Sequence, residues 1–93
     1  MTRTPIHPGE ILADELAEIN ITAFELASKI HVSVKHITDI IAGQESITVE
    51  TGMKLGKWFG TGPKIWLNLQ QAYELDVASL RVNLDDIVPR KAA

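Results

Sequence analysis

Cysteine is absent from this 93-residue sequence, and so are a long hydrophobic run and an excess of basic charge. Without cysteine the chain can form neither a disulfide framework nor a thiolate zinc site, and it has no cysteine nucleophile. No apolar stretch approaches the roughly 18 residues of a membrane helix, and the N-terminus lacks the basic start and apolar core of a secretory signal. These absences favour a cytoplasmic protein that has no contact with a membrane.

The composition that remains is that of a small globular protein. An apolar fraction of 45% and a charged fraction of 23% are ordinary for this class. The length allows one domain, residues 1–93, and neither a repeat nor a linker divides it. Because a chain this short buries a modest share of its surface, we expect a compact core or one that a partner completes.

Charged residues are unevenly distributed along the chain, whose formal net charge is −3. Residues 10–18 carry four acids and no base, whereas residues 22–64 carry five lysines against four acids. A local basic face can therefore exist on an acidic protein, but the attraction of one subunit for phosphate is weak. If the chain binds DNA, it needs two copies to do so well.

Helical spacing and capping residues predict an all-α protein of five helices. Pro8 suits the first position of the first helix, because its missing N–H has no partner there. The apolar face of that helix is formed by residues at helical spacing, namely Ile11, Leu12, Leu16 and Ile19. Thr48 caps a fourth helix that reaches about Phe59, and a fifth helix runs from Pro63 to at least Leu75.

Two further features concern packing in the second half of the chain. Gly52 and Gly56 lie on one face of the fourth helix, where each costs about 1 kcal/mol relative to alanine. We expect them to allow close packing without a Cβ atom in the way. Residues 77–88 fit both the alternation of a strand and the spacing of a helix, and the pattern is too short to decide.

Two short helices joined by a tight turn are predicted in the first half of the chain. Thr22 and Glu25 form a capping box that opens the first of them, and residues 31–33 make the turn. Ser33 caps the second helix, and Gly43 stops it. This order of caps, turn and stop favours a DNA-binding helix-turn-helix over a plain helical bundle.

The first turn of the second helix in such a motif enters the major groove. Lys35 can reach a guanine edge or a phosphate, Thr38 can touch a thymine methyl group or a phosphate, and Asp39 can accept from cytosine N4. Gln44, just past the helix, is positioned to touch the DNA backbone. The predicted DNA-contacting residues are Thr22, Ser33, Val34, Lys35, His36, Thr38, Asp39 and Gln44.

The last third of the chain predicts a dimer interface. The apolar side chains there are more than so small a monomer needs, which indicates a two-fold interface within about residues 63–88. Its predicted members are Trp66, Leu69, Tyr73 and Leu80. Such a dimer would hold two recognition helices about one DNA turn apart, or a multiple of that.

The same segments resemble known families. Residues 22–50 resemble the Cro/C1-type helix-turn-helix family of phage repressors, which implies a lambda-repressor-like bundle with the motif at helices two and three. The flanks read His-Pro-Gly-Glu-Ile-Leu at residues 7–12 and Pro-Lys-Ile-Trp-Leu-Asn-Leu-Gln-Gln-Ala-Tyr-Glu-Leu at residues 63–75. They narrow this resemblance to the HigA antitoxins, also called virulence-associated protein I, over roughly residues 6–78.

The resemblance implies the antitoxin of a type II toxin–antitoxin system. Proteins of that family are dimers that bind a palindromic operator, repress their own operon and neutralise HigB, a ribosome-dependent toxin that cleaves mRNA. The alternative is a stand-alone repressor of the same fold without a toxin partner. A third class, a purely structural bundle, would show no salt-dependent DNA binding.

Two positions depart from the wider family pattern. His31 stands in the turn where glycine is usual, so it must adopt a left-handed conformation or the turn must change shape. Ala23 stands where many relatives have a phosphate-contacting glutamine. Backbone amides at that helix start would have to take over the phosphate contact.

The first helix carries a possible toxin-docking face. Asp14 and Glu18 lie one turn apart, and such acids are usually a solvated surface. The sharper hypothesis is that they dock a basic toxin. The sequence predicts no enzyme, catalytic residue, metal or cofactor, because the three histidines lack paired ligand spacing and the serines lack a nucleophile motif.

Overall fold

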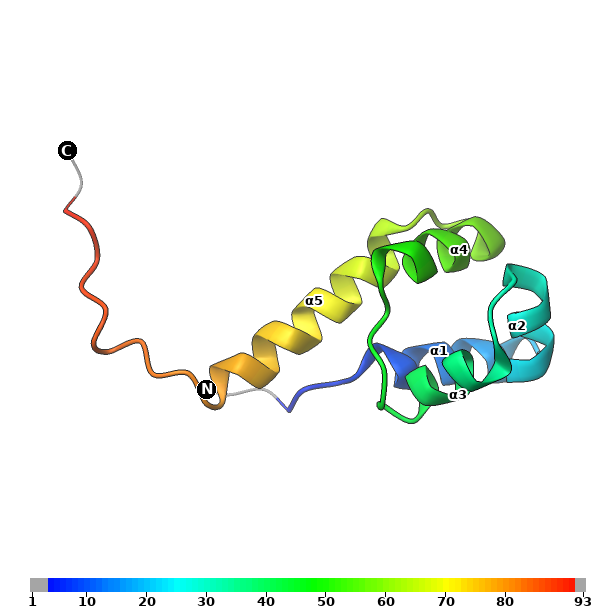
Figure 1. Ribbon diagram of the computed structural model, residues 1–93, viewed down its shortest axis with the longest axis horizontal. Coiled ribbons are helices and arrows are strands. Elements are labelled where there is room, and N and C mark those ends of the chain that lie inside the picture. Colours follow the sequence, from blue (N-terminus) through cyan, green and yellow to red (C-terminus); the bar gives the residue numbers. More distant parts are fainter. Residues whose placement is uncertain (1–3, 92–93) are drawn as a thin grey trace.

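The computed structural model describes residues 4–91, which form five α-helices joined by short turns (Figure 1). The helices are α1 (Pro8–Glu18), α2 (Ala23–Ile30), α3 (Val34–Ile41), α4 (Val49–Phe59) and α5 (Lys64–Ser79). The predicted all-α class and its five helices are confirmed. No helix in this described part is long and apolar enough to cross a membrane.

Side chains just before the helices set where they begin. The Nδ1 atom of His7 accepts from the backbone N–H of Gly9 at 2.9 Å, and Pro8 takes the first position of α1. Thr48 Oγ1 accepts from the backbone N–H of Thr51 at 3.2 Å and caps α4. These bonds satisfy amide groups that have no partner within the helix.

The core lies where the five helices meet. Helix α1 packs against α3 and α5, α2 packs against α3 and α4, and α4 packs against α5. The fully buried large apolar side chains are Leu12, Leu26, Ile37, Ile40 and Leu55. Each such burial contributes roughly 1.5–3 kcal/mol, so this small set supplies much of the stability of the chain.

Glycine allows two close approaches between elements. A Cβ atom at Gly56 would collide with the backbone of Gly62 and Pro63, and one at Gly52 would lie 2.7 Å from Leu67 Cδ2. The predicted close packing at both positions is therefore confirmed. Gly9, which the sequence did not single out, is tighter still, since its Cβ would collide with the backbone carbonyl of Ile40 and force α1 away from α3.

After Ser79 the C-terminal tail forms neither the strand nor the helix that its apolar pattern allowed. Helix α5 continues to Ser79, and the described residues after it, 81–91, form no helix or strand. Figure 1 shows α5 leaving the other helices diagonally and the tail continuing away from them. Its large apolar side chains are exposed, namely Leu80, Val82, Leu84, Ile87 and Val88. One chain leaves this apolar surface uncovered.

His7 is the buried titratable group of the fold. Its side chain caps α1 and packs edge-on against Tyr73, with the two rings 4.8 Å apart. Burial lowers the pKa of His7 below its ordinary value of 6.5, partly offset by a hydrogen bond to the Glu45 backbone and by the charge of Glu10. The folded chain therefore holds this ring neutral at pH values where the unfolded chain protonates it.

The free energy of unfolding should consequently depend on the protonation of His7. Well above pH 6.5, His7 is neutral in both states and does not affect the free energy of unfolding. As the pH falls from 6.5 toward the lowered pKa of the folded state, the free energy of unfolding decreases, because only the unfolded state gains the proton. We expect His7→Asn, which keeps a capping side chain, to reduce this slope in urea denaturation curves between pH 7.5 and 5.5. The exposed-histidine control His31→Asn should keep it, and equal slopes in both variants would contradict the assignment.

Candidate nucleic-acid interface

The helix-turn-helix forms although its turn lacks glycine. His31 adopts the left-handed conformation, with φ 59° and ψ 50°, and closes α2. The backbone N–H of Val32 donates to the Ala27 carbonyl at 3.0 Å, and Lys54 Nζ on α4 donates to the His31 carbonyl at 3.2 Å. Of the two alternatives that the sequence left open at this position, the structure shows the left-handed conformation of His31. The conformation costs a non-glycine residue about 1–2 kcal/mol.

Side-chain caps position the two helices of the motif. Both halves of the predicted capping box are present, with Thr22 Oγ1 accepting from Glu25 N at 3.1 Å and Glu25 Oε1 accepting from Thr22 N at 3.2 Å. Ser33 Oγ accepts from the backbone N–H of His36 at 3.1 Å and starts α3. Thr22 and Ser33 remain exposed, but Thr22 Oγ1 already donates to Glu25 Oε1 at 3.2 Å, so of the two hydroxyl groups that of Ser33 is the better placed to donate to a phosphate.

The outer face of α3 carries one ion pair. Lys35 Nζ lies 2.6 Å from Asp39 Oδ2, one helical turn away, and the side chains are 82% and 25% exposed. The hydrogen bond and charge of Asp39 raise the pKa of Lys35. Thr38 lies exposed on the same face, whereas Val34 is half-buried against the core. The carboxylate therefore offsets the positive charge of the only lysine on α3.

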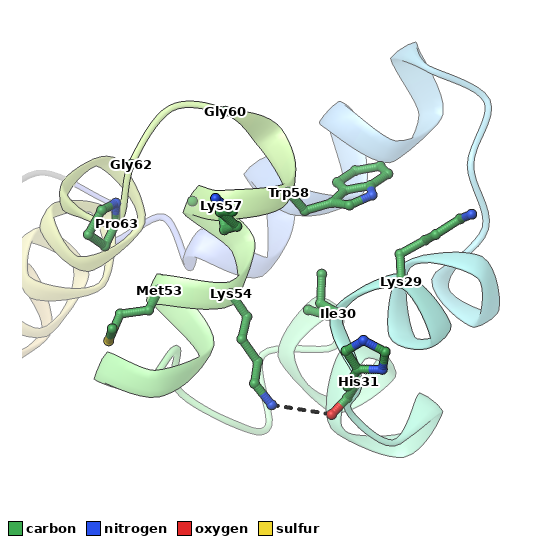
Figure 2. Close-up of a pocket in the computed structure, with 11 residues that line it drawn as sticks. Lys29, Ile30, His31, Met53, Lys54, Lys57, Trp58, Gly60, Gly62 and Pro63 are labelled. Atoms are coloured by element: carbon green, nitrogen blue, oxygen red, sulfur yellow. Dashed lines mark hydrogen bonds between the residues drawn. The ribbon is translucent and has the colours of Figure 1, made fainter.

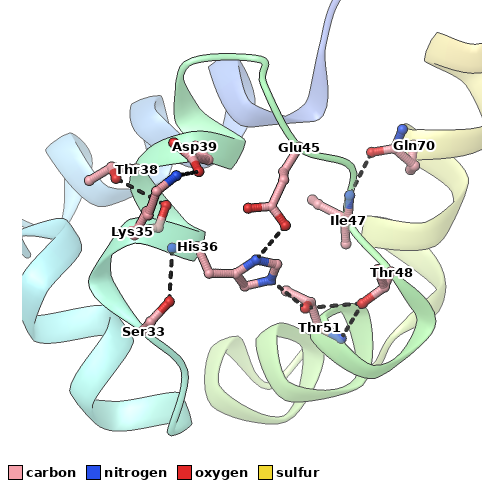
Figure 3. Close-up of polar contacts among 10 residues, drawn as sticks. All are labelled: Ser33, Lys35, His36, Thr38, Asp39, Glu45, Ile47, Thr48, Thr51 and Gln70. Atoms are coloured by element: carbon pink, nitrogen blue, oxygen red, sulfur yellow. Dashed lines mark hydrogen bonds and ion pairs between the residues drawn. The ribbon is translucent and has the colours of Figure 1, made fainter.

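His36 does not point outward, contrary to its predicted role as a DNA contact. Its Nδ1 lies 3.0 Å from Glu45 Oε1 and its Nε2 lies 2.8 Å from Thr51 Oγ1 (Figure 3). A carboxylate can only accept, so for a neutral ring Nδ1 donates to Glu45 and Nε2 accepts from the Thr51 hydroxyl. The Thr51 oxygen in turn accepts from Thr48 Oγ1 at 3.1 Å. The ring links α3 to α4.

Hydrogen bonds to α3 and α5 hold the loop between α3 and α4, residues 42–48. Gln44, a predicted DNA contact, is exposed, and its backbone N–H donates to the Asp39 carbonyl at 2.7 Å. Ile47 N–H donates to Gln70 Oε1 at 2.8 Å, and the Gln70 side chain is buried on α5 (Figure 3). Sequence reasoning did not assign this role to Gln70, although a polar residue among the buried positions of a helix is a usable signal.

The predicted dimer residues do not share one surface. Trp66 is 3% exposed and packs on Phe59 with ring centroids 5.3 Å apart, so it belongs to the core of its own chain and its assignment to the interface was wrong. Leu69 is half-buried against the same core, and Tyr73 is half-buried beside His7. Of the four, Leu80 is exposed, at 57%.

The predicted toxin-docking residues are exposed. Asp14 and Glu18 lie on α1 together with the exposed carboxylates of Glu10 and Glu15. Within residues 4–91, no group of three or more histidine and acidic side chains is arranged to hold a metal ion.

Comparison with known proteins identifies the family. No family model matches the sequence. Virulence-associated protein I of Dichelobacter nodosus is 40% identical over 86 residues, which cover 90% of this chain and 80% of that protein. The addiction module antidote protein of the HigA family from Coxiella burnetii superposes with a TM-score of 0.91 at 39% identity, over 96% of this chain and 100% of that one.

This chain belongs to the HigA antitoxin family. The comparisons thereby confirm the resemblance of the segments that flank the helix-turn-helix, and with it the prediction that the chain is an antitoxin that binds DNA. A further relative of known structure is antitoxin HigA of Pseudomonas aeruginosa, solved with the higBA promoter. It superposes with a TM-score of 0.81 at 35% identity, over 91% of this chain and 100% of that one.

The ion pair on α3 of the antitoxin gives a test of its outer face. Asp39→Asn should free the Lys35 ammonium for a phosphate, so we expect DNA affinity to rise several-fold and the salt dependence to steepen by about one unit per subunit. Titration of labelled duplex at several salt concentrations measures both. Asp14→Asn on α1 makes the same change of charge elsewhere and should have little effect, and a gain of equal size there would contradict the assignment. If operator affinity fell while affinity for unrelated DNA rose, Asp39 would instead be a base contact.

Proposed function

We propose that this antitoxin acts in the cytoplasm as a homodimer that binds a palindromic operator and represses its own operon. The observation that carries the proposal is the outer face of α3, whose start is capped by Ser33 and whose turn is closed by His31. The first turn of such a helix enters the major groove. The Pseudomonas aeruginosa relative, an antitoxin solved with a promoter, supports the same use of the motif here.

The residues on and beside the outer face of α3 have different proposed roles. Lys35, Thr38 and Gln44 are exposed and are the candidates for base or phosphate contacts. The exposed cap residues Thr22 and Ser33 lie at helix starts, where backbone amides attract phosphate, and this compensates for Ala23. We propose that His36 positions α3 and does not contact DNA, since a base contact would break its bonds to Glu45 and Thr51.

The proposed dimer interface is the uncovered side of α5 and the start of the tail. Ile65, Leu75 and Leu80 are 49%, 66% and 57% exposed, and they replace the buried Trp66 of the sequence-based prediction. We therefore propose that the chain is one domain whose dimerisation segment covers about residues 63–88. A two-fold axis through α5 would double the weak basic face and hold both α3 helices on one side of the DNA.

Acidic substitutions of the exposed apolar residues on α5 and at the start of the tail test the dimer. Leu75→Glu with Leu80→Glu should give a monomer by light scattering at micromolar concentration, because two buried charges at an interface cost several kcal/mol. Operator affinity should then fall by about 100-fold or more, since one subunit carries little positive charge. Ile19→Glu, an acidic substitution at the exposed residue that follows α1, should leave both unchanged. A dimer that survives the double substitution would contradict the proposed interface.

The second part of the proposed function is neutralisation of a HigB-type toxin. The acidic side of α1 offers carboxylates with no base beside them in residues 10–18, and a ribonuclease that binds RNA has a basic surface. The alternative is that this member of the family represses its operon without a toxin partner of its own. Co-expression with the neighbouring reading frame separates the two, because only an antitoxin rescues growth and co-purifies with the product of that frame.

Charge reversal on α1 tests the docking face itself. Asp14→Lys with Glu18→Lys should weaken binding of the co-purified toxin by ten-fold or more, since like charges then oppose each other. Operator affinity of the same variant should stay equal or rise slightly. Unchanged toxin affinity, measured by calorimetry, would exclude this face as the toxin site.

A further inference from the structure

A groove lies on the side of the molecule formed by the end of α2, the outer face of α4 and the turn into α5 (Figure 2). Its volume is about 870 Å³. The apolar part of its lining includes Ile30, Met53 and Trp58, and its rim carries Lys29, Lys54 and Lys57. Pro63, just before α5, closes one end, so the groove lies next to the start of the proposed dimer helix.

The three lysines give this groove a positive charge on an otherwise acidic chain. Figure 2 shows Lys54 reaching from α4 to the carbonyl of His31, and its Nζ also lies 3.5 Å from Glu50 Oε2. Lys29 and Lys57 are exposed and make no hydrogen bond or ion pair with any described residue. Cations above an apolar floor are complementary to a segment that combines carboxylates with apolar side chains.

Within the tail, the stretch between Arg81 and Arg90 contains such a segment. Residues 84–88 read Leu-Asp-Asp-Ile-Val, and all five are exposed. A turn shapes them, since Ile87 N–H donates to the Leu84 carbonyl at 3.0 Å and Asp85 N–H donates to Asn83 Oδ1 at 2.8 Å. The tail therefore offers two adjacent carboxylates between apolar side chains.

The tail leaves its own chain at the end of α5 that is far from the groove. The 16 residues of α5 span about 24 Å, and Figure 1 shows the tail continuing away from α4. If two α5 helices pair antiparallel, the end of the partner's α5 lies beside the start of this one, next to Pro63 and the groove. Six residues separate Leu80 from Asp86, so an extended tail places Asp86 up to about 20 Å from the end of the partner's α5.

We propose that residues 84–88 of one chain dock in the groove of its dimer partner, with Asp85 and Asp86 facing Lys29, Lys54 and Lys57 and with Ile87 and Val88 against the apolar floor. The inference rests on the proposed dimer through α5. It assigns an occupant to both uncovered surfaces, the groove and the tail, and each dimer contains the contact twice.

Engineered cysteines test the contact without background, because the chain has none of its own. Two differently tagged full-length chains, one with Lys57→Cys and one with Asp86→Cys, are co-expressed, purified as the mixed dimer and oxidised. We expect a disulfide-linked dimer in the majority of molecules, and a disulfide between these two chains can only be intermolecular. A mixed dimer with Glu18→Cys in place of Lys57→Cys should not link, because Glu18 is on α1, outside the groove.

The experiment distinguishes failure of the tail docking from failure of the proposed dimer. A mixed protein that is dimeric and binds operator but does not link overturns the docking of the tail and leaves the proposed function intact. A protein that is monomeric overturns both. If linking fails and Lys29→Glu with Lys57→Glu lowers operator affinity, the lysines serve DNA phosphates instead.

Charge reversal gives a second, independent measurement. Asp85→Lys with Asp86→Lys should raise the dissociation constant of the dimer about five-fold, and combining it with Lys29→Glu and Lys57→Glu should restore most of the loss. Weakening without recovery in the combined variant would show that these groups do not face each other, and would overturn the pairing.

Discussion

The orientation of α3 depends on how the loop that follows it is held. Residues 42–48 run from the end of the recognition helix to the start of α4, and they contain no regular structure that would fix them. Their position is set instead by polar contacts with distant elements: Glu45 with His36, the Ile47 amide with Gln70, and the Glu45 backbone with His7. Each contact involves a side chain that is buried or largely so, where an unpaired polar group costs about 1–3 kcal/mol.

This arrangement connects the proposed DNA face to the proposed dimer helix. Gln70 lies on α5 and its side-chain oxygen accepts from the loop, while its nitrogen donates to Glu74 Oε2 at 3.0 Å on the same helix. His7 contacts both the loop and Tyr73 of α5. A shift of α5 cannot occur without losing these bonds or moving the loop with it. The segment after α3 therefore keeps the recognition helix in a fixed relation to α5.

Local features of the sequence predicted local structure correctly. The caps at Thr22 and Ser33 bond to amides three residues away, as predicted, whereas the sequence left open whether His31 adopts the left-handed conformation or the turn changes shape. Such features are encoded within one turn of chain, so composition and spacing reveal them. The five helices, and hence the location of the candidate site, were predictable for this reason.

Contacts between distant residues were not predictable in this way. His36 was expected to face DNA because it lies in the first turns of α3, but its partners are 9 and 15 residues further along the chain. Gln70 bonds to a residue 23 positions away. Trp66 was assigned to a partner because an apolar position on an amphipathic helix looks the same whether its own chain or another covers it. Only the packing of α5 against α4 distinguishes the two.

In the proposed dimer, the charge distribution makes α5 important for DNA binding through α3. The lysine on α3 is already paired with Asp39, and the acids of α1 add negative charge to the same small chain. A single motif therefore has few free cations with which to displace counterions from DNA, and its affinity is low. Joining two motifs makes the second binding event intramolecular, with an effective concentration that multiplies weak contacts. In the proposed dimer, the apolar residues of α5 thus control operator occupancy without touching the DNA. Because each motif binds weakly by itself, loss of the dimer lowers operator occupancy sharply.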